Sequence, residues 1–167
     1  MRNFKRSDLE DFHKIRTDAE VRKYIAKPID HNIESTKKAL NEVIEAFNDH
    51  KALNWIIEDK ETGEFIGSGG FWRIDLKNNR AELGYSIKKK FWQKGIMTEV
   101  LKVILPFAFQ KAGIHSIMAC VDVNNTPSQK LLLKSGFKLE AHHRQDWYFE
   151  GKYFDTLVYG MIKEDLE

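Results

Sequence analysis

The stretch that decides the fold is AELGYSIKKKFWQKGIMTE, residues 81–99. Its first half alternates between apolar and polar side chains, as a β-strand with one buried face does. From Phe91 to Glu99 the chain then passes through a glycine-containing loop into an amphipathic helix. Gly95 allows a close approach to a ligand, and the free N–H groups and positive dipole end of the helix attract phosphate oxygens. The stretch therefore predicts a pyrophosphate site, although a glycine before a helix is more often only a turn.

The sequence before this stretch predicts two helices followed by antiparallel strands. A short strand near Phe4 leads into a helix that begins near Asp8, and a longer helix with one apolar stripe follows Asn32. Alternating runs joined by turns at residues 60–63 and 78–79 then predict three meandering strands, at residues 53–58, 65–72 and 80–87.

The sequence after it predicts a β-α-β unit and a closing hairpin. We expect a helix over about 98–111, bent at Pro106, then a strand over 115–123 and a short helix over 127–134. Residues 137–149 and 153–162 read as a hairpin that turns at Gly151. The fold class is α+β, one domain over residues 1–167, with a mixed sheet and helices on its faces.

Composition is typical of a globular protein rather than a nucleic-acid-binding or membrane protein. The chain has 27 basic and 25 acidic residues, a formal net charge of +2, and 42% hydrophobic residues. A near-neutral balance gives no reason to expect a polyanionic partner. The amino terminus is charged over residues 1–8, and no run has the apolar length of a signal peptide or membrane span, so we expect a cytoplasmic protein.

These segments resemble the GNAT superfamily of acyl-CoA-dependent N-acetyltransferases, whose pyrophosphate loop R/Q-x-x-G-x-G/A opens a helix. They are more similar to the branch with the ribosomal-protein alanine N-acetyltransferases, where a tryptophan replaces the leading Arg/Gln and an acidic residue follows. The residues that match this variant are Trp92, Lys94, Gly95, Thr98 and Glu99. AELGY at 81–85, Asn125-x-x-Ser128 with KSGF at 134–137, and DTLVYGM at 155–161 match too, so the resemblance covers nearly the whole chain.

The resemblance implies acetyl-CoA as cosubstrate, bound where two neighbouring parallel strands of the β-α-β unit splay apart. Its pantetheine would pair with the backbone of the strand that ends near Ile87. Asn125 would contact the pantetheine or shape its own loop, since Asn-Asn-Thr-Pro is also a plain turn-and-cap sequence. The implied cofactor-binding residues are Ile87, Lys88, Gln93, Lys94, Gly95, Ile96, Met97, Thr98 and Asn125.

Direct acetyl transfer requires positioning of two substrates, removal of a proton from the amine and support of the leaving thiolate. The resemblance implies Glu82 as the base and Ser128 as the acid or hydrogen-bond donor to the CoA sulfur. Glu99 is a second candidate base. Each also has a structural interpretation. Glu82 can be a solvated strand carboxylate, Ser128 a hydroxyl in the first turn of a helix, and Glu99 a carboxylate that interacts with a helix dipole. Backbone N–H groups near residues 86–88 are expected to face the thioester oxygen.

Three positions depart from the family pattern. Met97 stands where the loop prefers a small residue and can crowd the phosphate site. Gln93 stands where glycine is common, and Leu133 where glutamate is frequent.

Other noticeable residues have plain structural interpretations. Cys120 lies in an apolar run and is predicted to be a buried strand thiol. Lys88-Lys89-Lys90 is a solvated loop or an attractor of the cofactor's 3′-phosphate. His142-His143 is a polar strand pair without the spacing of a metal site, so no metal is expected. Aromatic residues on the expected strands are predicted to be core, with some able to line an acceptor channel: Trp55, Trp72, Trp147 and Tyr148.

We therefore predict an N-acetyltransferase that moves the acetyl group of acetyl-CoA to a primary amine. The amine is the amino terminus of a protein, ribosomal proteins included, or a small amine such as an antibiotic or polyamine. Scattered acidic residues favour a peptide or monoamine over a polycation. A non-catalytic acetyl-CoA sensor and an interaction domain that only shares the fold stay open. Exposed strand edges would allow a homodimer.

Overall fold

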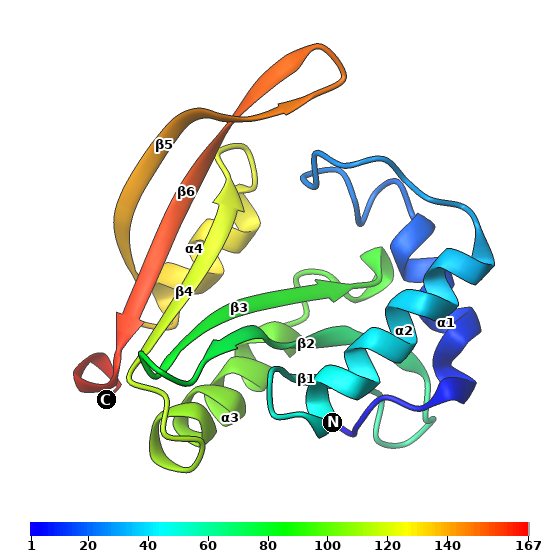
Figure 1. Ribbon diagram of the computed structural model, residues 1–167, viewed down its shortest axis with the longest axis horizontal. Helices are drawn as coiled ribbons and strands as arrows, with labels where there is room; N and C mark the ends of the chain where they lie inside the picture. The colour runs from blue at the N-terminus through cyan, green and yellow to red at the C-terminus, as the bar shows by residue number, and fades with distance from the viewer. Residues whose placement is uncertain (167) are drawn as a thin grey trace.

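A six-stranded mixed sheet forms the centre of the molecule, in a computed structural model that describes residues 1–166 (Figure 1). The strand order is β1-β2-β3-β4-β6-β5. The strands are β1 (Leu53–Glu58), β2 (Phe65–Asp75), β3 (Arg80–Ile87), β4 (Ser116–Asp122), β5 (Lys138–Phe149) and β6 (Lys152–Ile162). The helices are α1 (Leu9–Thr17), α2 (Ile33–Asn48), α3 (Ile96–Gln110) and α4 (Thr126–Lys134).

Each face of the sheet packs against helices through its own apolar core. Strand β1 shows this directly, because consecutive residues on a strand point to opposite faces. Ile57 belongs to the larger core, formed with α3 and α4, whereas Ile56 belongs to the smaller core with α1 and α2. We call the face that carries α3 and α4 the rear face and the opposite one the front face.

Strands β3 and β4 are parallel neighbours that separate after three residue pairs. Arg80 to Glu82 pair with Ser116 to Met118, and no residue from Leu83 to Ile87 pairs with β4 within the part of the chain that the structure describes. Figure 1 shows the two strands diverging from this point. The expectation of splayed parallel strands is confirmed, and we call the space between the unpaired parts of β3 and β4 the gap.

The β5–β6 hairpin extends beyond the rest of the sheet. Its pairing has irregularities between Leu139 and Ala141 and between His143 and Trp147, and most side chains of β5 are exposed. Figure 1 shows its far end reaching toward the segment that joins α1 to α2. The indole Nε1 of Trp147 donates a hydrogen bond to the carbonyl oxygen of Ala26, 2.6 Å away, and so fastens the hairpin to that segment.

Most of the expected elements are confirmed, with shifted ends. Helix α3 begins at Ile96 rather than Thr98 and continues past Pro106 to Gln110. The expected strand near Phe4 is reduced to a single bridge between Arg2 and Ile56. Phe4 instead packs edge-on against Phe12, so apolarity at that position reflects burial in the smaller core rather than a strand.

Two interpretations of buried residues were wrong for β4 and the hairpin. Cys120 is exposed, because the alternation of β4 places it on the front face while Ala119 and Val121 face the core. Trp55 does pack among the aromatic rings of Phe47, Phe71 and Phe107. Three other aromatic residues expected in the core are exposed instead: Trp72, Trp147 and Tyr148. The strand residues of the smaller core come from β1 and β2 only, so the front face of β4 and of the hairpin stays accessible, and Trp72 lies toward the far end of β2, outside that core.

Candidate active site

The loop before α3 leaves backbone amides available to bind an anion. Gly95 is the residue before the helix, with φ 77°, and a Cβ added there would meet no atom within 4 Å. The first intrahelical bond runs from Glu99 N–H to the Gly95 carbonyl, so the amides of residues 96–98 precede the bonded turns. No side chain caps this end of the helix within residues 1–166. A pyrophosphate fits these open donors and the positive end of a 15-residue helix dipole.

Met97 does not crowd that site. Its side chain is 7% exposed and belongs to the larger core, where its methyl group lies beside Gly69. The side chain therefore points into the protein while its backbone N–H stays in the loop. Gln93 has φ 60°, the left-handed region that favours glycine, which explains physically why glycine is common at that position in the family.

Trp92 fixes the loop to the end of β3. Its indole Nε1 donates to the carbonyl oxygen of Ile87 at 2.9 Å. Lys94 is exposed and its ammonium lies 5.5 Å from the centre of the Phe91 ring. The tryptophan that replaces Arg or Gln in this loop thus holds the loop in place rather than offering a charge.

The three consecutive lysines each have an acidic partner. Lys88 Nζ lies 3.3 Å from Asp11 Oδ1, and Lys89 Nζ lies 3.0 Å from Glu20 Oε2. Lys90 pairs with Glu64. The pairs of Lys88 and Lys89 join the end of β3 to α1 and the segment after it. Lys89 and Lys90 stay exposed, in agreement with the interpretation of this run as a solvated loop.

Only some backbone donors of β3 face the gap. The Lys88 N–H donates to the carbonyl oxygen of Ile66 at 2.9 Å, which directs it toward β2. Bonded pairs alternate along an antiparallel ladder, so Ser86 also bonds toward β2, whereas the backbone groups of Tyr85 and Ile87 face the gap. Of these two amides, the Ile87 N–H therefore points into the gap, and the Lys88 N–H does not.

Ser128 and Tyr85 meet across the gap. The hydroxyl oxygens of Ser128, in the first turn of α4, and Tyr85, on β3, are 2.6 Å apart, and either hydroxyl can be the donor. Burial raises the pKa of Tyr85, and the hydrogen bond with Ser128 opposes part of that rise. Tyr85 thus stays protonated at neutral pH. The sequence reasoning assigned Tyr85 no role, because only the fold brings it to Ser128.

Asn125 caps α4. Its Oδ1 accepts a hydrogen bond from the Ser128 N–H at 3.2 Å, a contact that satisfies one of the free donors at the helix start. The structure thus shows Asn125 in the loop-shaping role that was one of its two predicted interpretations. Its side chain sets the position of the residue whose hydroxyl meets Tyr85.

Glu82 lies on the front face of β3, beside the splay point. Its carboxylate is 30% exposed and lies 3.5 Å from the guanidinium of Arg73, which is 86% exposed, so the pair is weak. The indole of Trp72 covers Gly84, where a Cβ would lie 2.3 Å from Nε1. Glu82 therefore lies near the exposed indole of Trp72, on the front face and at the point where β3 and β4 separate. Glu99, in contrast, is exposed on the first turn of α3.

Cys120 faces the same side as Glu82 but is not poised as a nucleophile. Partial burial around the thiol, together with the carboxylates of Glu82 and Asp146, raises the pKa of Cys120. A raised pKa keeps the thiol protonated at neutral pH, where it is unreactive.

Residues 1–166 contain no group of three His, Cys, Asp or Glu side chains arranged to hold a metal ion. His142 Nε2 instead lies 2.6 Å from Asp155 Oδ2 across the hairpin. No helix described here has the length and apolarity needed to cross a bilayer.

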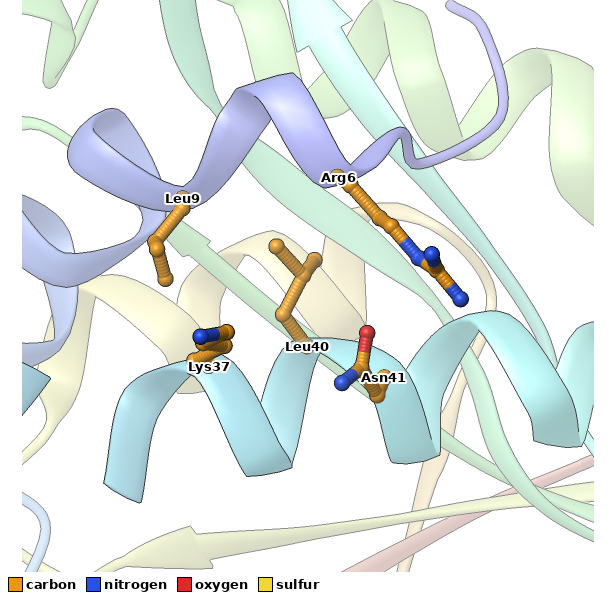
Figure 2. Close-up of a pocket in the computed structure, with 5 residues that line it drawn as sticks. All are labelled: Arg6, Leu9, Lys37, Leu40 and Asn41. Carbon is orange, nitrogen blue, oxygen red and sulfur yellow. The ribbon is translucent and has the colours of Figure 1, made fainter. Parts of the chain in front are cut away.

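A cavity of about 240 Å³ lies away from the gap, between α2 and the turn that opens α1. Figure 2 shows the side chains that surround it: Arg6, Leu9, Lys37, Leu40 and Asn41. None of them comes from β3, β4, α3 or α4, so this cavity has no part in the site described above.

The open amides before α3, the splayed strands and the Ser128 hydroxyl at the gap are the features that the resemblance to acyl-CoA-dependent acetyltransferases led us to expect. Residues 1–138 match the model of the Acetyltransferase (GNAT) domain. The chain is 36% identical over 136 residues to the N-acetyltransferase YoaA of Bacillus subtilis, covering 79% of this chain and 76% of YoaA. The chain therefore belongs to the GNAT family and is an acetyl-CoA-dependent N-acetyltransferase.

Two further similarities concern relatives with named acceptors. The chain is 28% identical over 99 residues to the ribosomal-protein-serine acetyltransferase of Escherichia coli, covering 59% of this chain and 55% of that protein. Its fold superposes with a TM-score of 0.87 on the spermidine N-acetyltransferase of Vibrio cholerae in complex with CoA and spermine. That superposition covers 98% of this chain and 95% of the other, at 20% identity, and so shows the fold alone.

Proposed function

We propose that this enzyme acetylates the primary amine of an acceptor that reaches the gap from the front face, with Glu82 as the base and Ser128 as the acid. The observation that carries the proposal is the gap itself. It is lined on one side by the Ile87 N–H and Tyr85 and on the other by Ser128. When bound, acetyl-CoA supplies the thioester whose carbonyl carbon takes up the amine.

The residues of the chain then divide the work of the reaction. The amides of residues 96–98 hold the pyrophosphate, and the Ile87 N–H donates to the thioester oxygen, where negative charge develops. Glu82 accepts the proton that the attacking amine loses, directly or through water. Positioning by this gap supplies much of the rate, because the two reactants meet in a fixed orientation.

Ser128 delivers a proton to the leaving sulfur. The Ser128 hydroxyl is weakly acidic by itself, so it takes up the proton of the Tyr85 hydroxyl, 2.6 Å away, as it gives its own to the sulfur, and Tyr85 is reprotonated from water. The raised pKa of Tyr85 keeps that proton in place at neutral pH until it is needed. Tyr85 thereby both positions Ser128 and replaces its proton.

For the acceptor we propose the amino terminus of a protein or a small monoamine. The similarity to a ribosomal-protein-serine acetyltransferase supports the former. A polyamine is the alternative that the similarity of fold to a spermidine acetyltransferase suggests. A polycation needs an acidic cleft, and the front entrance contributes Arg73 beside Glu82.

Calorimetric titration with acetyl-CoA tests the cofactor site. Wild type should bind, and Gly95→Glu should lose at least about 100-fold in affinity because a carboxylate would occupy the phosphate position. Gly113→Glu is the matched control: Gly113 has φ 71° and open space around its Cβ, but lies in the turn between α3 and β4. Equal losses in both variants would show a folding defect rather than a lost site.

Release of free thiol during incubation with candidate amines then tests catalysis. Product formation with a peptide amino terminus or a monoamine would support the proposed reaction. Tight binding of acetyl-CoA with no turnover across peptides, monoamines and polyamines would favour the non-catalytic sensor.

A further inference from the structure

A cavity of about 490 Å³ lies where the segment between α1 and α2 meets the hairpin. Its volume is within the range of small-molecule sites. The hydrogen bond from Trp147 to Ala26 fastens the two walls together although they are 121 residues apart in the sequence. The lining residues are Arg16, Arg22, Ile25, Lys27, Pro28, Asp30 and Trp147.

The charge of this cavity is mainly positive. Arg16, Arg22 and Lys27 contribute three cations, and Asp30 is the one anion among the lining residues. The Asp30 carboxylate already accepts a hydrogen bond from the Asn32 N–H at 2.9 Å. That bond, first among several causes, lowers the pKa of Asp30 and shows a carboxylate turned toward the start of α2. One engaged anion leaves the three cations under-compensated.

Arg22 has a buried donor that is not used. Its Nη2 donates to the carbonyl oxygens of Lys27 and Pro28, each at 3.2 Å, and so holds the segment in its curve. Its Nε is buried and has no hydrogen-bond partner within residues 1–166. Burial and the nearby charge of Arg16 lower the pKa of Arg22. The charge of Arg16 thus disfavours the charge of Arg22, whose buried Nε–H is unpaired, and a bound anion would offset both.

The cavity adjoins the front face that carries Glu82. Asp146 directly precedes Trp147 in β5, and it is near enough to Cys120 to contribute, after burial and Glu82, to the raised pKa of that thiol. The Cys120 thiol, on the front face of β4, is thus near enough to feel the charges of both Glu82, at the splay point, and Asp146, next to Trp147. A molecule that extends from the cavity along this face would approach Glu82.

We propose that this cavity binds an oxyanion, a carboxylate or phosphate, of the acceptor, so that the enzyme acetylates amines that also carry negative charge. This inference rests on the proposed function, since it deepens the choice of acceptor at the same site. Planar guanidinium groups suit both oxyanions, because each offers paired N–H donors. Trp147 and Ile25 supply an apolar wall for the carbon skeleton between oxyanion and amine. The same cations repel a polyamine.

Direct binding tests the cavity without any turnover. Inorganic phosphate and succinate are titrated separately into protein saturated with CoA, which keeps the pyrophosphate loop filled. Wild type should bind at least one of them, and the identity of that one separates a phosphate from a carboxylate ligand. Arg22→Gln and Arg16→Gln should each weaken binding about 10-fold or more.

Two variants are needed because Arg22 also holds the segment. Arg16→Gln leaves the bonds from Arg22 to Lys27 and Pro28 in place, so its loss cannot be ascribed to a collapsed wall. Lys102→Gln is the matched control, because Lys102 is an exposed cation on α3 and the substitution removes one charge far from the cavity. Absence of oxyanion binding to wild type, or equal binding in all variants, would overturn the proposal.

Acceptor selectivity provides the second arm. Three amines of one length, 5-aminopentanoate, pentylamine and 1,5-diaminopentane, differ only in the charge of the far end. We expect kcat/KM to fall in that order for wild type. In Arg16→Gln, the ratio of kcat/KM for 5-aminopentanoate to kcat/KM for pentylamine should be about 10-fold smaller. A preference for the diamine would overturn the inference while leaving an amine acetyltransferase. If acetyl-CoA binds but no amine reacts, the proposed function fails, and the titrations with phosphate and succinate still test whether the cavity binds an oxyanion.

Discussion

The loop at residues 92–98 and the cavity between Arg22 and Trp147, which we propose bind the cofactor and the acceptor respectively, are built in opposite ways. The loop offers backbone amides from consecutive residues, and its one buried side chain, Met97, points away from the ligand. The cavity offers side chains from segments more than 100 residues apart, joined by one hydrogen bond. Backbone donors tolerate changes of sequence around them, whereas side-chain donors do not. The fold thus keeps one cosubstrate while the acceptor changes with a few residues.

Replacing Glu82, the proposed base, should have the largest effect. Glu82→Gln keeps the shape and removes the proton acceptor, so kcat should fall about 100-fold or more while the affinity for acetyl-CoA is unchanged. Initial rates and calorimetric titration measure the two quantities. Glu99→Gln, on the exposed first turn of α3, is the matched control and should change kcat little. The reverse result would move the base from the front face to the cofactor side.

An ion pair lies at the start of α1, the helix that carries Arg16. The buried Asp8 accepts hydrogen bonds from Arg2 at 2.8 and 2.9 Å and from the Lys5 N–H at 2.7 Å. Burial alone would raise the pKa of Asp8, but these bonds outweigh it and hold the pKa below its usual value. Asp8→Asn should therefore lower the free energy of unfolding at pH 7 by about 2 kcal/mol.

The sign of its pH dependence follows from the lowered pKa. The unfolded carboxyl takes up its proton near pH 4 and the folded one only at lower pH, so the stabilisation is complete above pH 4 and disappears as pH falls through the folded pKa. Urea denaturation of both proteins between pH 7 and pH 3 measures this. A difference that stayed constant with pH would mean that packing, rather than charge, makes Asp8 important.

The cofactor side could be predicted from the sequence because its signals are local. Gly95 before a helix, the tryptophan at 92 and the alternation of residues 81–87 each report on neighbours within one turn or one strand. The splay of β3 from β4 was expected only through the family resemblance, because no sequence pattern within either strand indicates where their pairing stops. Lys88 stays a predicted cofactor-binding residue, although its amide bonds to Ile66 and its ammonium to Asp11, neither of which the sequence indicated.

The acceptor side could not be predicted, because it depends on pairs that only the fold creates. Trp147 looked like a core aromatic, yet it is exposed and bonds to Ala26. Cys120 looked like a buried thiol because its neighbours are apolar, and the strand alternation put it on the open face. Arg22 had no sequence feature that separated it from the other basic residues. Its buried Nε becomes visible only in three dimensions.

Tyr85 tests whether the acid is a single hydroxyl or a pair. Tyr85→Phe removes the 2.6 Å partner of Ser128 and should lower kcat about 10-fold, with little change in the affinity for acetyl-CoA. The double variant with Ser128→Ala should be no slower than Ser128→Ala alone, because both changes interrupt the same proton path. Additive losses in this cycle would assign Tyr85 to packing of the gap rather than to the positioning of Ser128.

The smallest expected effect concerns the bond that closes the acceptor cavity. Trp147→Phe keeps an aromatic ring near Lys27 but removes the donor to Ala26, a loss of about 1 kcal/mol, or roughly fivefold. The two walls then separate more easily, so KM for the acceptor should rise about that much while the affinity for acetyl-CoA stays the same.

Tyr148→Phe is the control, since Tyr148 is exposed on the same strand and packs against Tyr153 across the hairpin. A rise in KM for the acceptor confined to Trp147→Phe would show that the two sites are tuned independently. A parallel loss of acetyl-CoA affinity would show that the hairpin and the cofactor loop move as one unit, and the contrast between the two regions would fail.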